Sequence, residues 1–134
     1  MKRIIGLYGR KNSGKTTTLN LLIELLGREG QEDNPVSIDD YRGKTIVITP
    51  GGDDEEVIRK NLEAFKKAGG DILVIASRTQ GQTTIPLSDY IGGNSVDITW
   101  IKKNYAEIRT YLVNQAQAED IKAVIDLKIN EWDK

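Results

Sequence analysis

The chain has 134 residues, with 19 lysines and arginines against 20 aspartates and glutamates, and a formal net charge of −1. It contains no cysteine and no histidine, which excludes disulfides, thiol chemistry, histidine general bases and the common zinc sites. This length predicts a single domain over residues 1–134, and the balanced charge gives no strong signal for nucleic-acid binding.

The first part of the chain predicts a strand, a glycine loop and a helix in succession. Residues 3–8 form a short apolar run, and residues 15–26 carry leucine and isoleucine at helical spacing. Between them, residues 9–16 read G-R-K-N-S-G-K-T and fit the pattern G-x-x-x-x-G-K-[ST]. Glycines let such a loop bend around an anion, while its N–H groups and the positive end of the helix attract that anion. The sequence therefore predicts a phosphate-binding loop.

This motif resembles the Walker A motif of the P-loop NTPases, and the resemblance covers about the first quarter of the chain. It implies that Lys15 reaches the β- and γ-phosphates, that the Thr16 hydroxyl ligates Mg²⁺, and that Thr17 faces the α-phosphate. Residues 12–19 also resemble the start of the small GTP-binding proteins of molybdenum cofactor maturation. The nucleotide-binding residues implied by the resemblance are Gly9, Arg10, Lys11, Asn12, Ser13, Gly14, Lys15, Thr16 and Thr17.

The rest of the chain alternates predicted strands and helices. Strands are expected at 36–39, 44–49, 71–76 and 96–100, and an amphipathic helix at 53–68. A helix is expected from residue 103 to the end, with Tyr105, Ile108 and Leu112 in its apolar stripe. It could break at 114–118, and 125–129 also suits a short last strand. The polar segment 77–94 is predicted to be a long loop, and such loops are often functional.

This order of elements predicts an α/β fold, a three-layer P-loop NTPase-like domain with a mainly parallel sheet of about five strands. The layout resembles the kinase–GTPase branch, in which the second long strand lies beside the P-loop strand. Ligands bind such sheets beyond the C-terminal strand ends. Residues 8–16, 49–54 and 76–81 are therefore expected to meet there.

Catalytic groups are harder to assign, because neither later apolar strand ends in the aspartate that P-loop NTPases normally use. Asp53 could take that place and hold the metal or orient a water; alternatively, it caps the helix that follows. Arg78 could stabilise charge in the transition state, or it is a surface arginine. The pair Asp39-Asp40 could serve a small kinase, although a plain turn explains it as well.

We therefore expect a Mg²⁺-dependent ATP-binding protein that hydrolyses ATP slowly or transfers its γ-phosphate. Lys15, Asp53 and Arg78 would be catalytic, and Thr16 and Asp53 would bind the metal. ATP is the default nucleotide because the sequence lacks Asn-Lys-x-Asp, the guanine-reading signature. One alternative is a nucleotide-binding switch or adaptor without useful catalysis, and another is a small-molecule kinase that uses Asp39 or Asp40.

The setting of the protein is a further expectation. No apolar run approaches the roughly 20 residues of a membrane helix, and the N-terminus lacks the features of a signal peptide. We therefore expect a cytoplasmic protein that does not associate with membranes. The weak set of acidic groups suggests a homodimer or a protein partner that completes the site.

Overall fold

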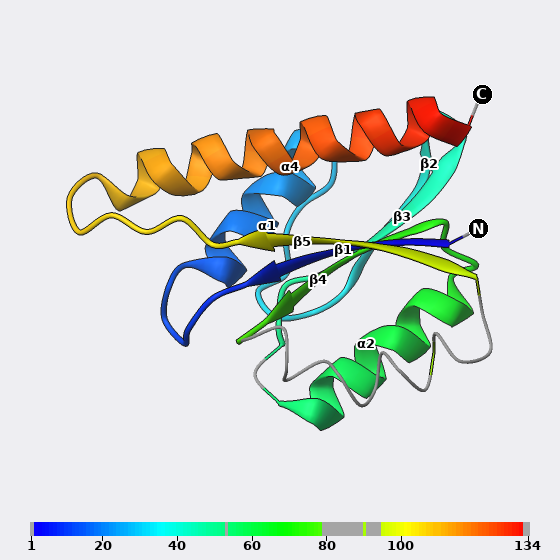
Figure 1. Cartoon of the computed structure of the whole chain (residues 1–134), viewed down its shortest axis with the longest axis horizontal. Coiled ribbons are helices and arrows are strands. Elements are labelled where there is room, and N and C mark those ends of the chain that lie inside the picture. The colour runs from blue at the N-terminus through cyan, green and yellow to red at the C-terminus, as the bar shows by residue number, and fades with distance from the viewer. Residues whose placement is uncertain (1, 53, 79–89, 91–94, 133–134) are drawn as a thin grey trace.

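The computed structural model describes residues 2–52, 54–78, 90 and 95–132. In these residues the chain is an α/β domain with one five-stranded, mostly parallel sheet and three helices (Figure 1). The strands are β1 (Lys2–Tyr8), β2 (Val36–Tyr41), β3 (Lys44–Thr49), β4 (Ile72–Ser77) and β5 (Val96–Lys102). The helices are α1 (Lys15–Leu25), α2 (Glu55–Lys67) and α4 (Thr110–Trp132).

The strand order is β2-β3-β4-β1-β5, with β2 antiparallel to β3 and the other pairs parallel. Val74 of β4 pairs with Ile5 of β1 on one side and with Ile48 of β3 on the other. The expectation that the second long strand, residues 44–49, lies beside the first strand is therefore wrong. All six residues of β4 are buried, as suits a nearly all-apolar strand at the centre of a parallel sheet.

Helices cover both faces of the sheet. Helices α1 and α4 lie side by side on one face, and α2 lies on the other (Figure 1). Because successive side chains of a strand point to opposite faces, Ile5 and Val74 pack under α1 and α4, whereas Ile4 and Leu73 pack against α2. Two apolar clusters thus hold one sheet between helices.

The C-terminal helix differs from its predicted form in two ways. It is continuous from Thr110 to Trp132, so neither the break at 114–118 nor a last strand at 125–129 forms. Residues 103–109 are not helical, and Tyr105, Ile108 and Leu112 are exposed rather than packed in the core. The apolar stripe that packs in the core begins later in the chain, with Ala118, Ile121 and Ile125. The exposed apolar residues before it extend past the edge of the sheet. That segment lies beyond the end of β5 in Figure 1.

Helix α2 begins one residue later than its capping pattern suggests. The side chain of Asp54, not Asp53, accepts a hydrogen bond from the Val57 N–H at 2.9 Å and caps the helix. Asp53 itself lies outside the described residues. Glu55 and Arg59, one helical turn apart, form an ion pair at 3.0 Å on the exposed face of the helix.

The far end of the sheet from the glycine loop is fixed by an ion cluster around Asp97 of β5. This carboxylate contacts Lys128 of α4 at 2.9 Å and Arg3 of β1 at 3.2 Å. The hydrogen bond from Lys128 lowers the pKa of Asp97; burial opposes this effect, and Arg3 lowers the pKa further. The cluster therefore ties the C-terminal half of α4 to the sheet through a charged carboxylate.

Acidification should weaken this link. A carboxylate whose pKa is depressed by folding stabilises the native state above its unfolded pKa, near 4, and loses that contribution as the pH falls through its folded pKa. We expect the urea midpoint of the wild type to fall between pH 7 and pH 3, and to fall less in Asp97→Asn. The exposed-pair variant Glu55→Gln serves as the control and should keep the wild-type pH dependence. Equal pH dependence in Asp97→Asn and the wild type would contradict this role of Asp97.

Candidate functional site

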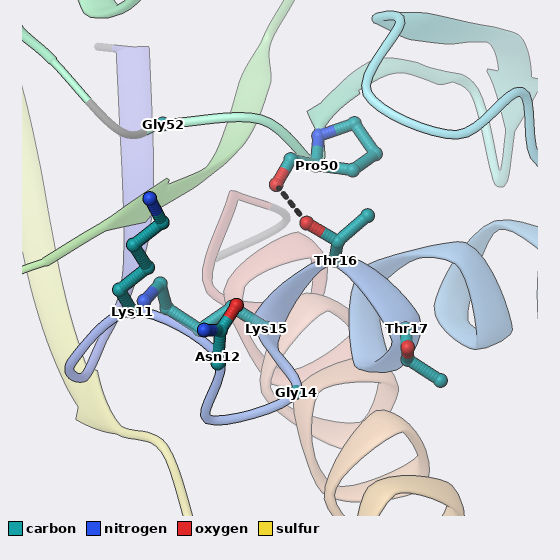
Figure 2. Close-up of a pocket in the computed structure, with 8 residues that line it drawn as sticks. All are labelled: Lys11, Asn12, Gly14, Lys15, Thr16, Thr17, Pro50 and Gly52. Carbon is teal, nitrogen blue, oxygen red and sulfur yellow. Dashed lines mark hydrogen bonds between the residues drawn. The ribbon is translucent and has the colours of Figure 1, made fainter.

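Three loops meet at the C-terminal edge of the parallel strands. The Gly9 N–H donates to the Ser77 carbonyl at 3.1 Å, which joins the loop after β1 to the end of β4. The Thr16 hydroxyl donates to the Pro50 carbonyl at 3.3 Å, which joins α1 to the loop after β3 (Figure 2). The predicted meeting of these segments is confirmed for the described residues; residues 53 and 79–81 lie outside them.

The glycine loop, residues 9–16, leads into α1 through Gly14. Gly14 has φ +97°, a left-handed conformation that favours glycine, and it caps α1 without a side-chain hydrogen bond. The first helical bond runs from the Thr18 N–H to the Gly14 carbonyl at 2.9 Å. The first turn of α1, which follows Gly14, carries the positive end of the helix dipole.

Lys15 lies inside the curve of this loop. Only 7% of its surface is exposed, and its ammonium group donates to the carbonyl of Gly9 and to that of Arg10, the latter at 2.9 Å. A buried ammonium needs such partners, because removing a charge from water without them is costly. The loop thus holds one positive charge at its centre, and the helix end adds to it.

A hollow of about 340 Å³ opens over the glycine loop and the loop after β3. Figure 2 shows Thr16 bonded to Pro50 at one side of it, with the extended Lys11 side chain at the other side of the view. The described lining residues include two lysines and no carboxylate. They are Lys11, Asn12, Gly14, Lys15, Thr16, Thr17, Pro50 and Gly52, and we call this space the first hollow. Its chemistry suits an anion.

A magnesium ion also fits this donor set. Mg²⁺ prefers oxygen ligands and usually keeps several waters and phosphate oxygens while taking only one or two ligands from the protein. The Thr16 hydroxyl supplies one such oxygen at the wall of the first hollow. Among all the described residues, the first hollow included, no group of three or more histidine, cysteine, aspartate or glutamate side chains is placed to hold a metal ion.

Sequence reasoning missed the residue that positions the loop after β3. Asn61 lies on the buried side of α2 with Ile58, Leu62 and Phe65, and 4% of it is exposed. Its Nδ2 donates to the Gly51 carbonyl at 2.7 Å. The available signal was a polar residue on an otherwise apolar helix face, since a buried amide needs a partner. Asn61 therefore fixes one wall of the first hollow.

Helix α4 contributes two buried amides that the sequence reasoning also missed. One packs against the glycine loop, and the other binds the segment after β5. Asn114 packs against Gly14, where an added Cβ would lie 2.9 Å from the Asn114 Oδ1. Gln117 donates to the Lys102 carbonyl at 2.7 Å and accepts from the Asn104 N–H at 2.8 Å. Both amides stand in the stripe that faces the core, in the interval first expected to break the helix.

The other predicted site residues differ in whether the structure describes them and in where they lie. Arg78 follows β4 at the same edge as the glycine loop and is exposed. Asp53 lies outside the described residues, so its roles as metal ligand and catalytic group stay predictions. The nine residues implied by the Walker A resemblance all lie in one loop and one helical turn. Of these, the Ser13 N–H is already engaged by the Arg10 carbonyl at 3.2 Å.

Asp39 and Asp40 do not join the site. Because β2 is antiparallel to β3, its end at Tyr41 pairs with Lys44 at the start of β3, away from the C-terminal edge where the loops meet. The Asp40 side chain instead accepts from the Gly43 N–H at 3.1 Å, and Asp39 accepts from the Ser37 hydroxyl at 2.7 Å. Both aspartates belong to β2, and the turn itself begins at Arg42, later than expected. The placement of this pair beside the glycine loop is wrong.

Comparison of the chain with protein-family models, curated proteins and solved structures found no match. None of the helices in the described part of the chain has the length and apolar character needed to cross a membrane. The class of the site therefore follows from geometry alone. It is a glycine loop at a helix N-terminus, set at the C-terminal edge of a parallel sheet and built around a buried lysine, an arrangement that suits an anion.

Proposed function

We propose that this protein binds a nucleoside triphosphate with Mg²⁺, with the phosphates in the first hollow. The observation that carries the proposal is the ammonium group of Lys15, held by the Gly9 and Arg10 carbonyls at the N-terminus of α1. A phosphate chain there would replace the neutral carbonyl acceptors with ionised oxygens, so that both partners of each bond would carry charge. The position of the loop at the N-terminus of α1, the positive end of the helix dipole, supports the same ligand.

Each residue has a distinct part in this proposal. Lys15 and the loop N–H groups bind the phosphate oxygens, and Thr16 holds the metal together with those oxygens. Magnesium, when bound, neutralises charge on the phosphates. Arg78 follows β4 at this edge of the sheet and is proposed to stabilise charge that develops on the phosphates. ATP is the proposed nucleotide, since the guanine-reading Asn-Lys-x-Asp sequence is absent from the chain.

Turnover is proposed to be slow. Phosphoryl transfer needs a group that orients the attacking water or hydroxyl, and the described residues that line the first hollow include no carboxylate. Asp53 is the remaining candidate for this role. The small-molecule kinase alternative lacks the carboxylate that it requires near the phosphates, because Asp39 and Asp40 lie at the other end of the sheet.

A nucleotide-dependent switch or adaptor is the second candidate function. Four large apolar side chains, Tyr105, Ile108, Tyr111 and Leu112, are 48–79% exposed on the segment that leaves β5 and enters α4. Apolar groups gathered on a surface in this way often mark a protein contact, with a partner or with a second copy of the chain. Binding of nucleotide without measurable hydrolysis would favour this function over a slow ATPase.

Calorimetric titration tests the proposal. A non-hydrolysable ATP analogue and its GTP counterpart are each added with and without Mg²⁺. We expect one-to-one binding of the ATP analogue, at least about tenfold tighter with Mg²⁺, and weaker binding of the GTP analogue. Absence of binding by both nucleotides would overturn the proposal. Equal binding of both would leave a triphosphate site and remove the preference for ATP.

A further inference from the structure

A second hollow of about 800 Å³ adjoins the first one across the glycine loop. Lys11 and Asn12 line both spaces, so a ligand in one lies next to a ligand in the other. The described residues that line it include four cations and no carboxylate. They are Gly9, Arg10, Lys11, Asn12, Ser13, Lys102, Lys103, Asn104 and Tyr105, and we call this space the second hollow.

Lys103 is held tightly against the glycine loop. Its N–H donates to the Tyr8 carbonyl at 2.7 Å, and a Cβ added at Gly9 would lie 2.8 Å from the Lys103 Cβ. On either side of it, the Lys102 carbonyl and the Asn104 N–H are both bound by the buried amide of Gln117. The lysine is thus placed by β1, by β5 and by α4 at once.

The burial of Lys103 is electrostatically unusual. Only 5% of its surface is exposed, and its ammonium group donates to the carbonyl of Asn104. Burial lowers the pKa of Lys103, and the charge of Lys15 lowers it further. No carboxylate of the described residues contributes to the shift in the pKa of Lys103. A second positive charge close to a buried ammonium group is costly, so an anion beside Lys103 would be favoured.

We propose that the second hollow is a phosphate-binding subsite, with Lys103 as its central ligand group. An anion there would face Lys103 together with Arg10 and Lys11 and would offset the repulsion between the two buried lysines. A neutral nucleobase would leave that repulsion uncompensated. The phosphate belongs either to the same polyphosphate chain that occupies the first hollow or to a second, phosphorylated molecule.

This subsite is tested by titration with inorganic pyrophosphate and tripolyphosphate, neither of which carries a nucleoside. We expect Lys103→Met to weaken the binding of at least one of them by about tenfold, because a charge-assisted bond is lost. The matched control is Lys102→Met, an exposed cation of the same hollow, for which we expect less than a threefold change, since exposed charges act weakly. Lys103→Gln provides a second variant without the charge.

The melting temperature of the Lys103 variants distinguishes a ligand-binding role of Lys103 from a structural role. Methionine keeps the length of the side chain and removes an uncompensated buried charge, so Lys103→Met should melt at or above the wild-type temperature. Unchanged affinity for both probes in Lys103→Met and Lys103→Gln would overturn the subsite. Equal losses in Lys103→Met and Lys102→Met would also overturn it, because they would indicate a diffuse positive field.

The source of the phosphate is resolved in a Lys15→Ala background. Binding of pyrophosphate that persists there and still depends on Lys103 would support a separate phosphorylated molecule. An effect of Lys103 that appears only with tripolyphosphate and vanishes in Lys15→Ala would support one chain spanning both hollows. The two proposals can fail separately: binding of pyrophosphate through Lys103 without binding of either nucleotide would keep the subsite and overturn the proposed function.

Discussion

Replacing Lys15 with alanine is expected to abolish detectable binding of the ATP analogue, a loss of at least about 100-fold in affinity. The reason is that Lys15 supplies the one ammonium group enclosed by the loop carbonyls at the N-terminus of α1. Its removal deletes a charge-assisted bond to the phosphates and leaves those carbonyls facing them. Calorimetric titration with Mg²⁺ measures the change.

The matched control is Lys11→Ala, which removes an exposed lysine from the wall of the same hollow. We expect only a few-fold loss of affinity there, because an exposed cation contributes little when water and salt screen it. Thermal melting of both variants establishes that each is folded. Wild-type affinity in a folded Lys15→Ala protein would contradict the proposed placement of the phosphates.

Replacing Gly52 with alanine is expected to destabilise the protein by about 3 kcal/mol or more. A Cβ at this position would overlap the carbonyl group of Ala76, whose carbonyl carbon would lie only 2.6 Å away. Ala76 belongs to the central strand β4 and is paired with Leu7 of β1, so it cannot move without disturbing the sheet. Chemical denaturation of the variant measures the effect.

Gly43→Ala is the control for the Gly52 variant. Gly43 lies in the turn between β2 and β3 with φ +82°, and open space surrounds it, so alanine there costs only backbone strain of about 1 kcal/mol. Nucleotide binding should survive in Gly43→Ala and weaken in any folded fraction of Gly52→Ala, since Gly52 lines the first hollow. Similar losses of stability in the two variants would show that the loop after β3 moves away from β4.

Local sequence patterns were sufficient for most of the elements and for the glycine loop at the N-terminus of α1. The β-branched run 44–49 forms β3 at the predicted bounds, and the amphipathic pattern of 53–68 forms α2 over Glu55–Lys67. Spacing alone also predicted that the segments after β1, β3 and β4 would meet, because parallel strands present their C-terminal ends at one edge of a sheet. The residues of the first hollow follow from these local rules.

Strand order and direction were decided by the tertiary structure. The apolar character of β3 and β4 is similar, so periodicity could not tell which of them would pair with β1; full burial between two neighbours selects β4. The antiparallel pairing of β2 with β3 likewise carries Asp39 and Asp40 to the other end of the sheet. Such pairings depend on contacts between residues far apart in the chain, which a local pattern does not contain.

The polar groups behind the glycine loop show most clearly the difference between what local sequence predicts and what the tertiary structure decides. From the sequence, Asn114 and Gln117 weaken the apolar stripe of a helix, and Lys103 is one more cation on a chain with balanced charge. In the folded protein all three are buried: Asn114 and Lys103 lie against the glycine loop, and Gln117 holds the segment on either side of Lys103. The sequence determined where a phosphate could bind, because a glycine loop and a helix end are local structures. Only the packing of α4 and β5 decided what surrounds it, because the burial of a polar side chain depends on the partners that distant segments bring to it.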